Sequence, residues 1–206
     1  MNIPGARMLR SLQIVAILTL VGTSYAQAQT YTGPKNLGPF RIDKDVSMNS
    51  LFARLGRPSS TKADTFCYRS ADRKAFLTVT RMSAVYDETI AASVTLSSSR
   101  TCINRTVQIA PNDLAGWKTD KGVGLTSTEE QVEKAYGTPS KVVSPEGADY
   151  GGVIYGNITS SDHPSGERPE LGSKALIYQG AANDLSLAEF GIKDGRVVWI
   201  SLSYNE

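Results

Sequence analysis

A nine-residue pattern that occurs twice constrains the fold of this chain more than any other feature. Leu51–Ser59 (LFARLGRPS) returns 81 residues later as Val132–Ser140 (VEKAYGTPS). In both copies an amphipathic stretch runs into a glycine, Gly56 or Gly137. A helix commonly finishes at such a glycine, because glycine adopts the left-handed backbone conformation cheaply. The pattern therefore predicts the ends of two similar short helices.

A proline follows each glycine after two positions, as Pro58 and Pro139, and prevents the helix from continuing. The second helix also has a start signal, because Ser127 and the residue three positions later, Glu130, can form a capping box. One side of each helix is expected to be apolar: Met48, Leu51, Phe52 and Leu55 in the first, and Leu125, Val132 and Tyr136 in the second.

Strand patterns follow each predicted helix. They cover Thr65–Arg69, Ala75–Met82 and Ile90–Ser97 after the first helix, and Gly152–Tyr155, Lys174–Tyr178, Leu185–Ile192 and Arg196–Tyr204 after the second. Because helices this short do not hold alone, each should cover one face of its sheet. The sequence thus predicts an α+β fold of two tandem units, each a short helical segment packed on an antiparallel β-meander. Chance similarity between the two helix ends remains the alternative.

The repeat predicts a first helix-plus-sheet unit at 29–105 and a second at 106–206, which follow a signal peptide predicted at 1–28. Between the units, Thr106–Ala110 has the pattern of a further short strand, and Trp117 is expected at the joint. A turn signal, Lys193–Gly195, joins the last two strand patterns into a hairpin.

The first 28 residues have the three parts of a secretory signal peptide. These are a positive start, an apolar stretch and a small-x-small cleavage site: Arg7 and Arg10, Leu12–Val21, and Ala26–Ala28. The apolar stretch is too short for a membrane anchor, and Gln29 stands where a lipoprotein needs a cysteine. We therefore expect a periplasmic or extracellular protein without a stable membrane anchor.

The charge balance excludes one class of partner. Removal of the signal leaves 20 basic and 20 acidic residues, so no strongly cationic surface for nucleic acid is expected. A content of 40% hydrophobic and 20% charged residues is typical of an ordinary globular domain. The expected partner is another protein.

The residues that carry catalytic or metal chemistry are few. Cys67 and Cys102 are the two cysteines, and in an oxidising compartment such a pair most often forms a disulfide, which would stabilise the fold by roughly 4 kcal/mol. The single histidine, His163, lies in a loop pattern and is interpreted as a solvated residue rather than a base. Two thiols and one imidazole do not make a zinc tetrad. No metal, cofactor or catalytic residue is predicted.

The last strand pattern suggests a contact residue. Alternation assigns Val198, Ile200, Leu202 and Tyr204 to the face beneath the helix, and Val197, Trp199, Ser201 and Ser203 to the opposite face. A tryptophan among serines on a helix-free face suits a protein contact, so Trp199 is the candidate, with Tyr150 and Tyr155 as weaker ones. The alternative is that Trp199 packs beneath residues 150–173 or against the other unit.

Two stretches carry a resemblance to a known family. Gly124–Pro139 (GLTSTEEQVEKAYGTP) and Phe190–Ile200 (FGIKDGRVVWI) resemble the β-lactamase-inhibitor-protein-like fold, a unit shared by the small lipoprotein of the outer-membrane barrel-assembly machinery. The resemblance covers most of residues 38–204 and implies an exported chain with two tandem units. The chain differs from the inhibitor in having no cysteine in the second unit, and from the lipoprotein in lacking an N-terminal cysteine.

These observations predict an exported protein-binding module without enzymatic activity. Its leading form is an inhibitor of an exported enzyme, with free sheet faces as the contact surface and residues 144–173 reaching into a cleft. A cell-envelope assembly or maintenance adaptor is one alternative. A carboxylate-dependent hydrolase is another, and it would need two acids facing one pocket.

Overall fold

The computed structural model describes residues 31–42, 44–58, 64–82, 89–99, 106–111, 113–144, 172–180 and 186–204. Several predictions concern other residues and stay predictions: the signal peptide, the strand Gly152–Tyr155, nearly all of the segment 144–173, Cys102, Tyr150, Tyr155 and His163.

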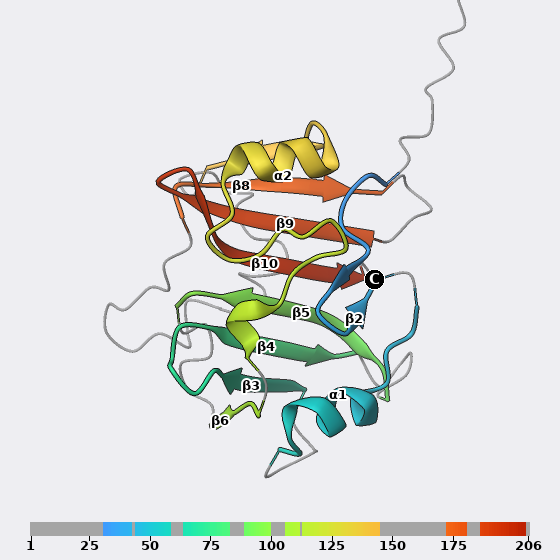
Figure 1. Ribbon diagram of the computed structural model, residues 1–206. Coiled ribbons are helices and arrows are strands. Elements are labelled where there is room, and N and C mark those ends of the chain that lie inside the picture. The colour runs from blue at the N-terminus through green and yellow to red at the C-terminus, as the bar shows by residue number, and fades with distance from the viewer. Residues whose placement is uncertain are drawn as a thin grey trace, which may run out of the picture.

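The described residues form a mixed α+β fold with two helices and one large sheet (Figure 1). The helices are α1 (Met48–Leu55), α2 (Glu129–Tyr136) and the short 3-10 helix η1 (Leu114–Gly116). The strands are β1 (Asn36–Leu37), β2 (Phe40–Arg41), β3 (Thr65–Arg69), β4 (Phe76–Arg81), β5 (Ala91–Ser97), β6 (Val107–Ile109), β7 (Lys141–Val143), β8 (Lys174–Gln179), β9 (Ser186–Lys193) and β10 (Arg196–Tyr204). Where a described strand was predicted, its limits are confirmed to within one residue. The sequence patterns missed β1, β2, β7 and η1.

Eight strands make one sheet in the order β6-β3-β4-β5-β10-β9-β8-β7, and β1 pairs with β2 separately. Figure 1 shows β3, β4 and β5 as one antiparallel series after α1, and β8, β9 and β10 as another after α2. The two series meet through antiparallel pairing of β5 with β10. β6, which lies in the range predicted for the second unit, pairs in parallel with β3.

Both helices end at the predicted glycines, where φ is +88° at Gly56 and +78° at Gly137. The predicted start of α2 is wrong by one residue. Thr128 is the N-cap, and its capping box is with Gln131 rather than between Ser127 and Glu130. Ser127 instead accepts a hydrogen bond from the backbone of Gly124, so its side chain is already engaged in the preceding turn.

The main core lies between the sheet and the elements that cover one of its faces. α1, α2, β1, β2 and the segment through η1 all lie on this face (Figure 1). Their buried side chains form a single cluster with the sheet, including Leu37, Leu51, Leu114, Val132 and Phe190. Trp117 packs against the same cluster beside Gly38, where a Cβ would lie 2.4 Å from its ring.

Two β-bulges shift the alternation of side chains in the central strands. β5 passes over Ala92 in its pairing with β4, and β10 passes over Val198 in its pairing with β9. Each bulge turns the preceding residue toward the main core, so Val197 lies in that cluster and Val198 packs on the other side of the sheet. The predicted faces of Val197 and Val198 are therefore wrong. The bulge in β5 likewise places Ala91 rather than Ala92 in the core.

The ends of the two helices make matching contacts with the sheet. The Tyr68 hydroxyl of β3 donates to the Gly56 carbonyl at 3.1 Å, and the Tyr178 hydroxyl of β8 donates to the Gly137 carbonyl at 3.0 Å. At the other ends, the N-caps form isolated β-bridges. Ser47 bridges Ile90, which directly precedes β5, and Thr128 bridges Arg196, the first residue of β10.

Candidate functional site

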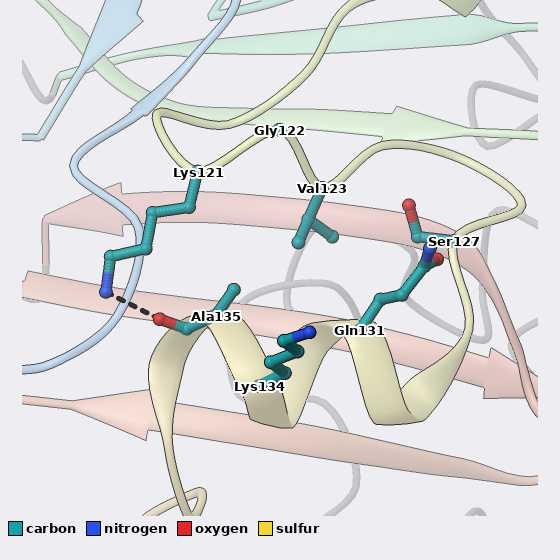
Figure 2. A pocket seen from close by; sticks show the side chains of 7 residues that line it. All are labelled: Lys121, Gly122, Val123, Ser127, Gln131, Lys134 and Ala135. Carbon is teal, nitrogen blue, oxygen red and sulfur yellow. Dashed lines mark hydrogen bonds between the residues drawn. The ribbon is translucent and has the colours of Figure 1, made fainter.

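An open groove lies between α2 and the segment that leads into it (Figure 2). Its volume is about 350 Å³. The residues that line it are Lys121, Gly122, Val123, Ser127, Gln131, Lys134 and Ala135. We call this feature the α2 groove. Val123 is its buried floor, while Lys121, Gln131 and Lys134 are exposed at its rim.

Tyr136, the last residue of α2, fixes the distance between the two walls of the groove. Its hydroxyl lies 2.6 Å from Thr119 Oγ1 and 2.9 Å from Asp120 Oδ1, both of which it faces as a donor. The Thr119 hydroxyl also accepts a hydrogen bond from the Val123 backbone at 3.1 Å. Burial raises the pKa of Tyr136 well above its usual value, so the phenol stays protonated and can donate.

Lys121 closes one end of the groove. Its Nζ donates to the carbonyl of Ala135 at 2.6 Å, as the dashed line in Figure 2 shows. The same ammonium lies 4.8 Å from the centre of the Tyr136 ring. A cation at this place complements the negative end of the α2 dipole and the face of the aromatic ring. Lys121 therefore holds the end of the helix and still faces solvent.

The two polar side chains of the groove use their oxygen atoms for internal contacts. Gln131 Oε1 accepts a hydrogen bond from the Thr128 backbone at 2.8 Å. Ser127 Oγ accepts one from the Gly124 backbone at 3.1 Å. The amide nitrogen of Gln131 and the hydroxyl proton of Ser127 are left for other partners.

The opposite side of the sheet differs from the predicted bare surface. We call it the reverse face and define it by five buried hydroxyl residues of the central strands: Ser93, Thr95, Ser97, Ser201 and Ser203. A second apolar cluster lies on the same side, formed by Val143, Ala175, Ile177, Leu187 and Trp199. The side chains of both sets are buried, so this face is not the bare sheet surface that the sequence predicted.

Glu189 is the one buried acid on this face among the described residues. Its side chain is 3% exposed, and Oε2 has no hydrogen-bond partner there. Burial raises its pKa to about 7, because an ionised carboxylate loses its hydration inside the protein. Its cross-strand neighbours are Ile177 and Ser201, so the described strands place no second acid directly beside it.

Trp199, the predicted contact residue, is 3% exposed. Its indole lies directly over Gly191 of β9, so closely that a Cβ on that glycine would clash with it. The ring therefore packs inside the fold on a neighbouring strand of its own predicted unit, and the alternative that residues 150–173 cover it stays a prediction. Cys67 is also buried, and the part of the chain that is described contains no free thiol. Its pairing with Cys102 stays a prediction.

Sequence reasoning missed the residues that line the α2 groove. Lys121 and Lys134 belong to different elements and line one groove only because α2 folds back along the preceding segment. A weaker signal was available for Glu189, which interrupts an apolar strand pattern at Leu187–Ile192. Within the described ranges, no cluster of three or more metal-ligating residues occurs, and no helix is long and apolar enough to cross a membrane.

Comparison with known proteins adds little. No family model matches the chain, and no curated protein matches it. Among solved structures, the chain is similar to the crystal structure of a DUF4309 family protein, YjgB from Bacillus subtilis. The two share 13% sequence identity with a TM-score of 0.39, over 77% of this chain and 78% of that chain. A similarity this weak carries no argument about function.

Proposed function

We propose that this protein is an exported protein-binding module whose contact surface includes the α2 groove, and that its leading form is an inhibitor of an exported enzyme. The observation that carries the proposal is the groove itself, which is open to solvent and lined by side chains with unused hydrogen-bond donors. A rigid helix and an anchored segment form its walls, which is the arrangement that gives a preformed contact surface.

We further infer that the scaffold is one helix-and-meander unit present twice. Support comes from the hydrogen bonds at the start of each helix. The Met48 backbone donates to Thr89 at 2.7 Å, and the Glu129 backbone donates to Gly195 at 3.0 Å. In each half, the donor is the first residue of the helix, and the acceptor lies just before the strand, β5 or β10, that pairs across the joint.

Strand pairing gives independent support for the duplication. The two bulges lie at corresponding positions, Ala92 in β5 and Val198 in β10. Each lies two residues after the residue that forms the isolated β-bridge with the N-cap of the helix. At the joint of the halves, Thr95 pairs with Ser201, and these two residues correspond to one another under the same alignment. A residue paired with its own counterpart marks a local two-fold relation between the two units.

The groove chemistry belongs to only one of these units. In the alignment of the helices that the repeat implies, Gln131 and Lys134 of α2 correspond to Ser50 and Ala53 of α1. At these two positions the second unit thus supplies a long polar and a cationic side chain, whereas α1 has short ones. Duplicated scaffolds in which one copy carries the site are consistent with function residing in side chains rather than in the fold.

The alternatives are weighed by the same geometry. The resemblance to the β-lactamase-inhibitor-protein-like fold favours an inhibitor, while the adaptor alternative would use the same groove with a cell-envelope partner. The hydrolase alternative draws on Glu189, whose pKa of about 7 suits a general acid. It lacks the second carboxyl at the adjacent described strand positions, so we place it last.

The experiment uses the chain from Gln29 onward, immobilised and exposed to the exported proteins of its own source. We expect one partner to be retained saturably, to form a complex of fixed stoichiometry by light scattering, and to be displaced by the soluble protein. An inhibitor then reduces the activity of the retained enzyme in proportion to its amount, whereas an adaptor retains outer-membrane components.

The binding proposal is contradicted if no saturable complex forms and the purified protein instead turns over a substrate. That turnover must survive replacement of both cysteines and of His163, which removes the thiols and the imidazole as sources of activity. Loss of turnover in Glu189→Gln with the fold retained would then assign the protein to the hydrolase alternative.

A further inference from the structure

We propose that the α2 groove receives a carboxylate-bearing segment of the partner, so that acidic side chains of the partner lie between Lys121 and Lys134. This inference rests on the proposed function and specifies the chemistry of the partner at that same site. Three features of the groove carry it: its charge, the type of hydrogen-bonding groups left unused, and its shape.

The charge of the groove is positive. Two of its lining residues are lysines and none is acidic. Glu130 stands one helical turn before Lys134, a spacing that permits an ion pair, yet no such pair forms between these described residues in the structure. Lys174, by contrast, is paired with Glu129 at 2.6 Å outside the groove. An incoming anion would therefore meet two lysines that form no ion pair with a carboxylate of the described residues.

The unused hydrogen-bonding groups are mainly donors. An ammonium has three N–H donors, and Lys121 spends one of them on the Ala135 carbonyl. The oxygen atoms of Gln131 and Ser127 already accept backbone hydrogen bonds, which leaves the amide N–H₂ and the hydroxyl proton. Lys134 contributes a further ammonium at the rim (Figure 2). A site that offers donors on every side selects a ligand rich in acceptors, and a carboxylate has only acceptors.

The shape of the groove favours an acidic chain segment over a small free anion. Its volume of about 350 Å³ lies at the lower end of the range for sites that hold organic groups, and a single small ion would leave most of it empty. Val123 and Ala135 supply an apolar floor and wall that would contact the methylene groups of a glutamate side chain. A glutamate side chain matches this arrangement when its carboxylate lies at the lysine rim and its methylene groups lie against Val123 and Ala135.

The test uses a blocked hexaglutamate peptide as the probe and follows it by residue-resolved NMR titration of the full mature protein. We expect saturable shifts of the Gln131 side-chain amide and the backbone around Val123, and weaker binding at higher ionic strength. Lys134→Glu should weaken the affinity about tenfold or more, since it replaces an attractive charge by a repulsive one. Lys118→Glu is the matched control, because Lys118 is exposed and close in sequence but does not line the groove.

Lys134 is preferred over Lys121 for the main variant, because Lys121 also holds the end of α2. Lys121→Met is a second variant, interpreted only if its unfolding transition remains cooperative. The proposal is overturned if hexaglutamine binds as tightly as hexaglutamate, if Lys118→Glu weakens binding as much as Lys134→Glu, or if inorganic phosphate saturates the same shifts at the same concentration. The last result would mean an adventitious ion only.

Failure of this inference and failure of the proposed function give different results. If Lys134→Glu still captures the exported partner with unchanged affinity, the binding function stands and the acidic-segment inference is wrong. If hexaglutamate binds in the groove but no exported protein is retained saturably, the groove chemistry stands and the proposed function is wrong.

Discussion

At the scale of single residues, Glu189 stands out because its carboxyl is buried without a full set of hydrogen bonds. One of its oxygens, Oε2, has no partner among the described residues, and only 3% of the side chain is exposed. Burying an unpaired ionised group is unfavourable, so the protein holds the neutral form over a wider pH range than usual. Its pKa of about 7, against an ordinary 4.5, expresses that preference.

A dependence of stability on pH follows from this shift. Below about pH 4.5 the group is neutral in both folded and unfolded chains and contributes no penalty. Between 4.5 and 7 the unfolded chain releases the proton while the folded chain keeps it, so stability falls as pH rises. Above pH 7 the loss is complete, at about 3 kcal/mol.

Glu189→Gln removes this titration. We expect the variant to gain about 3 kcal/mol over the wild type between pH 4 and pH 8, measured by urea unfolding at each pH. Comparing the two proteins at the same pH cancels the contribution of the other carboxyls. Glu130→Gln, an exposed change, should show no such trend. Parallel stability curves for wild type and Glu189→Gln would show that the carboxyl is not protonated by burial.

At the scale of elements, each helix is tied to its sheet by a tyrosine hydroxyl. Tyr68 and Tyr178 both donate to the carbonyl of the glycine that ends a helix. Burial raises the pKa of each phenol to about 12, so both remain donors at any physiological pH. Because a helix of two turns is marginal alone, these bonds and the packing below them stabilise each helix against the sheet.

Replacing either tyrosine by phenylalanine keeps the ring and removes the bond. We expect Tyr68→Phe and Tyr178→Phe each to lower the free energy of unfolding by about 1 kcal/mol, as measured in denaturant, since a helix carbonyl then loses its partner. Similar losses at the two sites are expected because the contacts match. Tyr204→Phe is the control, since its hydroxyl contact is exposed and should matter less. A loss at one site alone would mean that the two helix ends are held differently.

Element limits were largely accessible from the sequence, because glycine, proline and period-two patterns act locally. The helix ends at Gly56 and Gly137 required only a glycine that could adopt a positive φ. The predictions that were wrong each required a choice between two adjacent residues. Thr128 and Ser127 are both good N-caps, and the bridge between Thr128 and Arg196 fixes which one is used. The bulge at Val198 likewise depends on pairing with β9, which strand alternation does not encode.

At the scale of the whole molecule, the two halves share one sheet and one core. The main cluster contains residues of both, from Leu51 in α1 to Leu202 in β10. At the joint, the hydroxyls of Thr95 and Ser201 lie 2.9 Å apart and both are buried. A shared core of this kind predicts that the halves unfold together.

A double-mutant cycle tests the joint. Thr95→Val and Ser201→Ala each leave the other hydroxyl unpaired, so we expect each to destabilise by about 1–2 kcal/mol and the double variant by about 1 kcal/mol less than their sum. Fluorescence and far-UV circular dichroism should report one coincident unfolding transition for the wild type. Additive losses, or two separate transitions, would show that the hydrogen bond does not couple the halves.

The α2 groove could not be predicted from the sequence, because it depends on how separate elements of the molecule pack together. Lys121 and Lys134 belong to different elements, which are brought together by tertiary contacts: those of Tyr136 with Thr119 and Asp120, and the hydrogen bond from Lys121 to Ala135. Trp199 shows the opposite failure. A tryptophan among serines indicated an exposed contact, but Gly191 on the neighbouring strand offered a flat backbone surface on which the indole packs. Local composition does not reveal such cross-strand complementarity.

The position of β10 has a consequence for how the molecule is made. This strand comes after every other described strand in the sequence, yet it lies in the middle of the sheet between β5 and β9. Before Arg196–Tyr204 is present, the edges of β5 and β9 have no strand to pair with. The two series of strands can therefore join only after this strand is made, and a polypeptide that lacks it exposes the edges of β5 and β9, which can then pair with other chains.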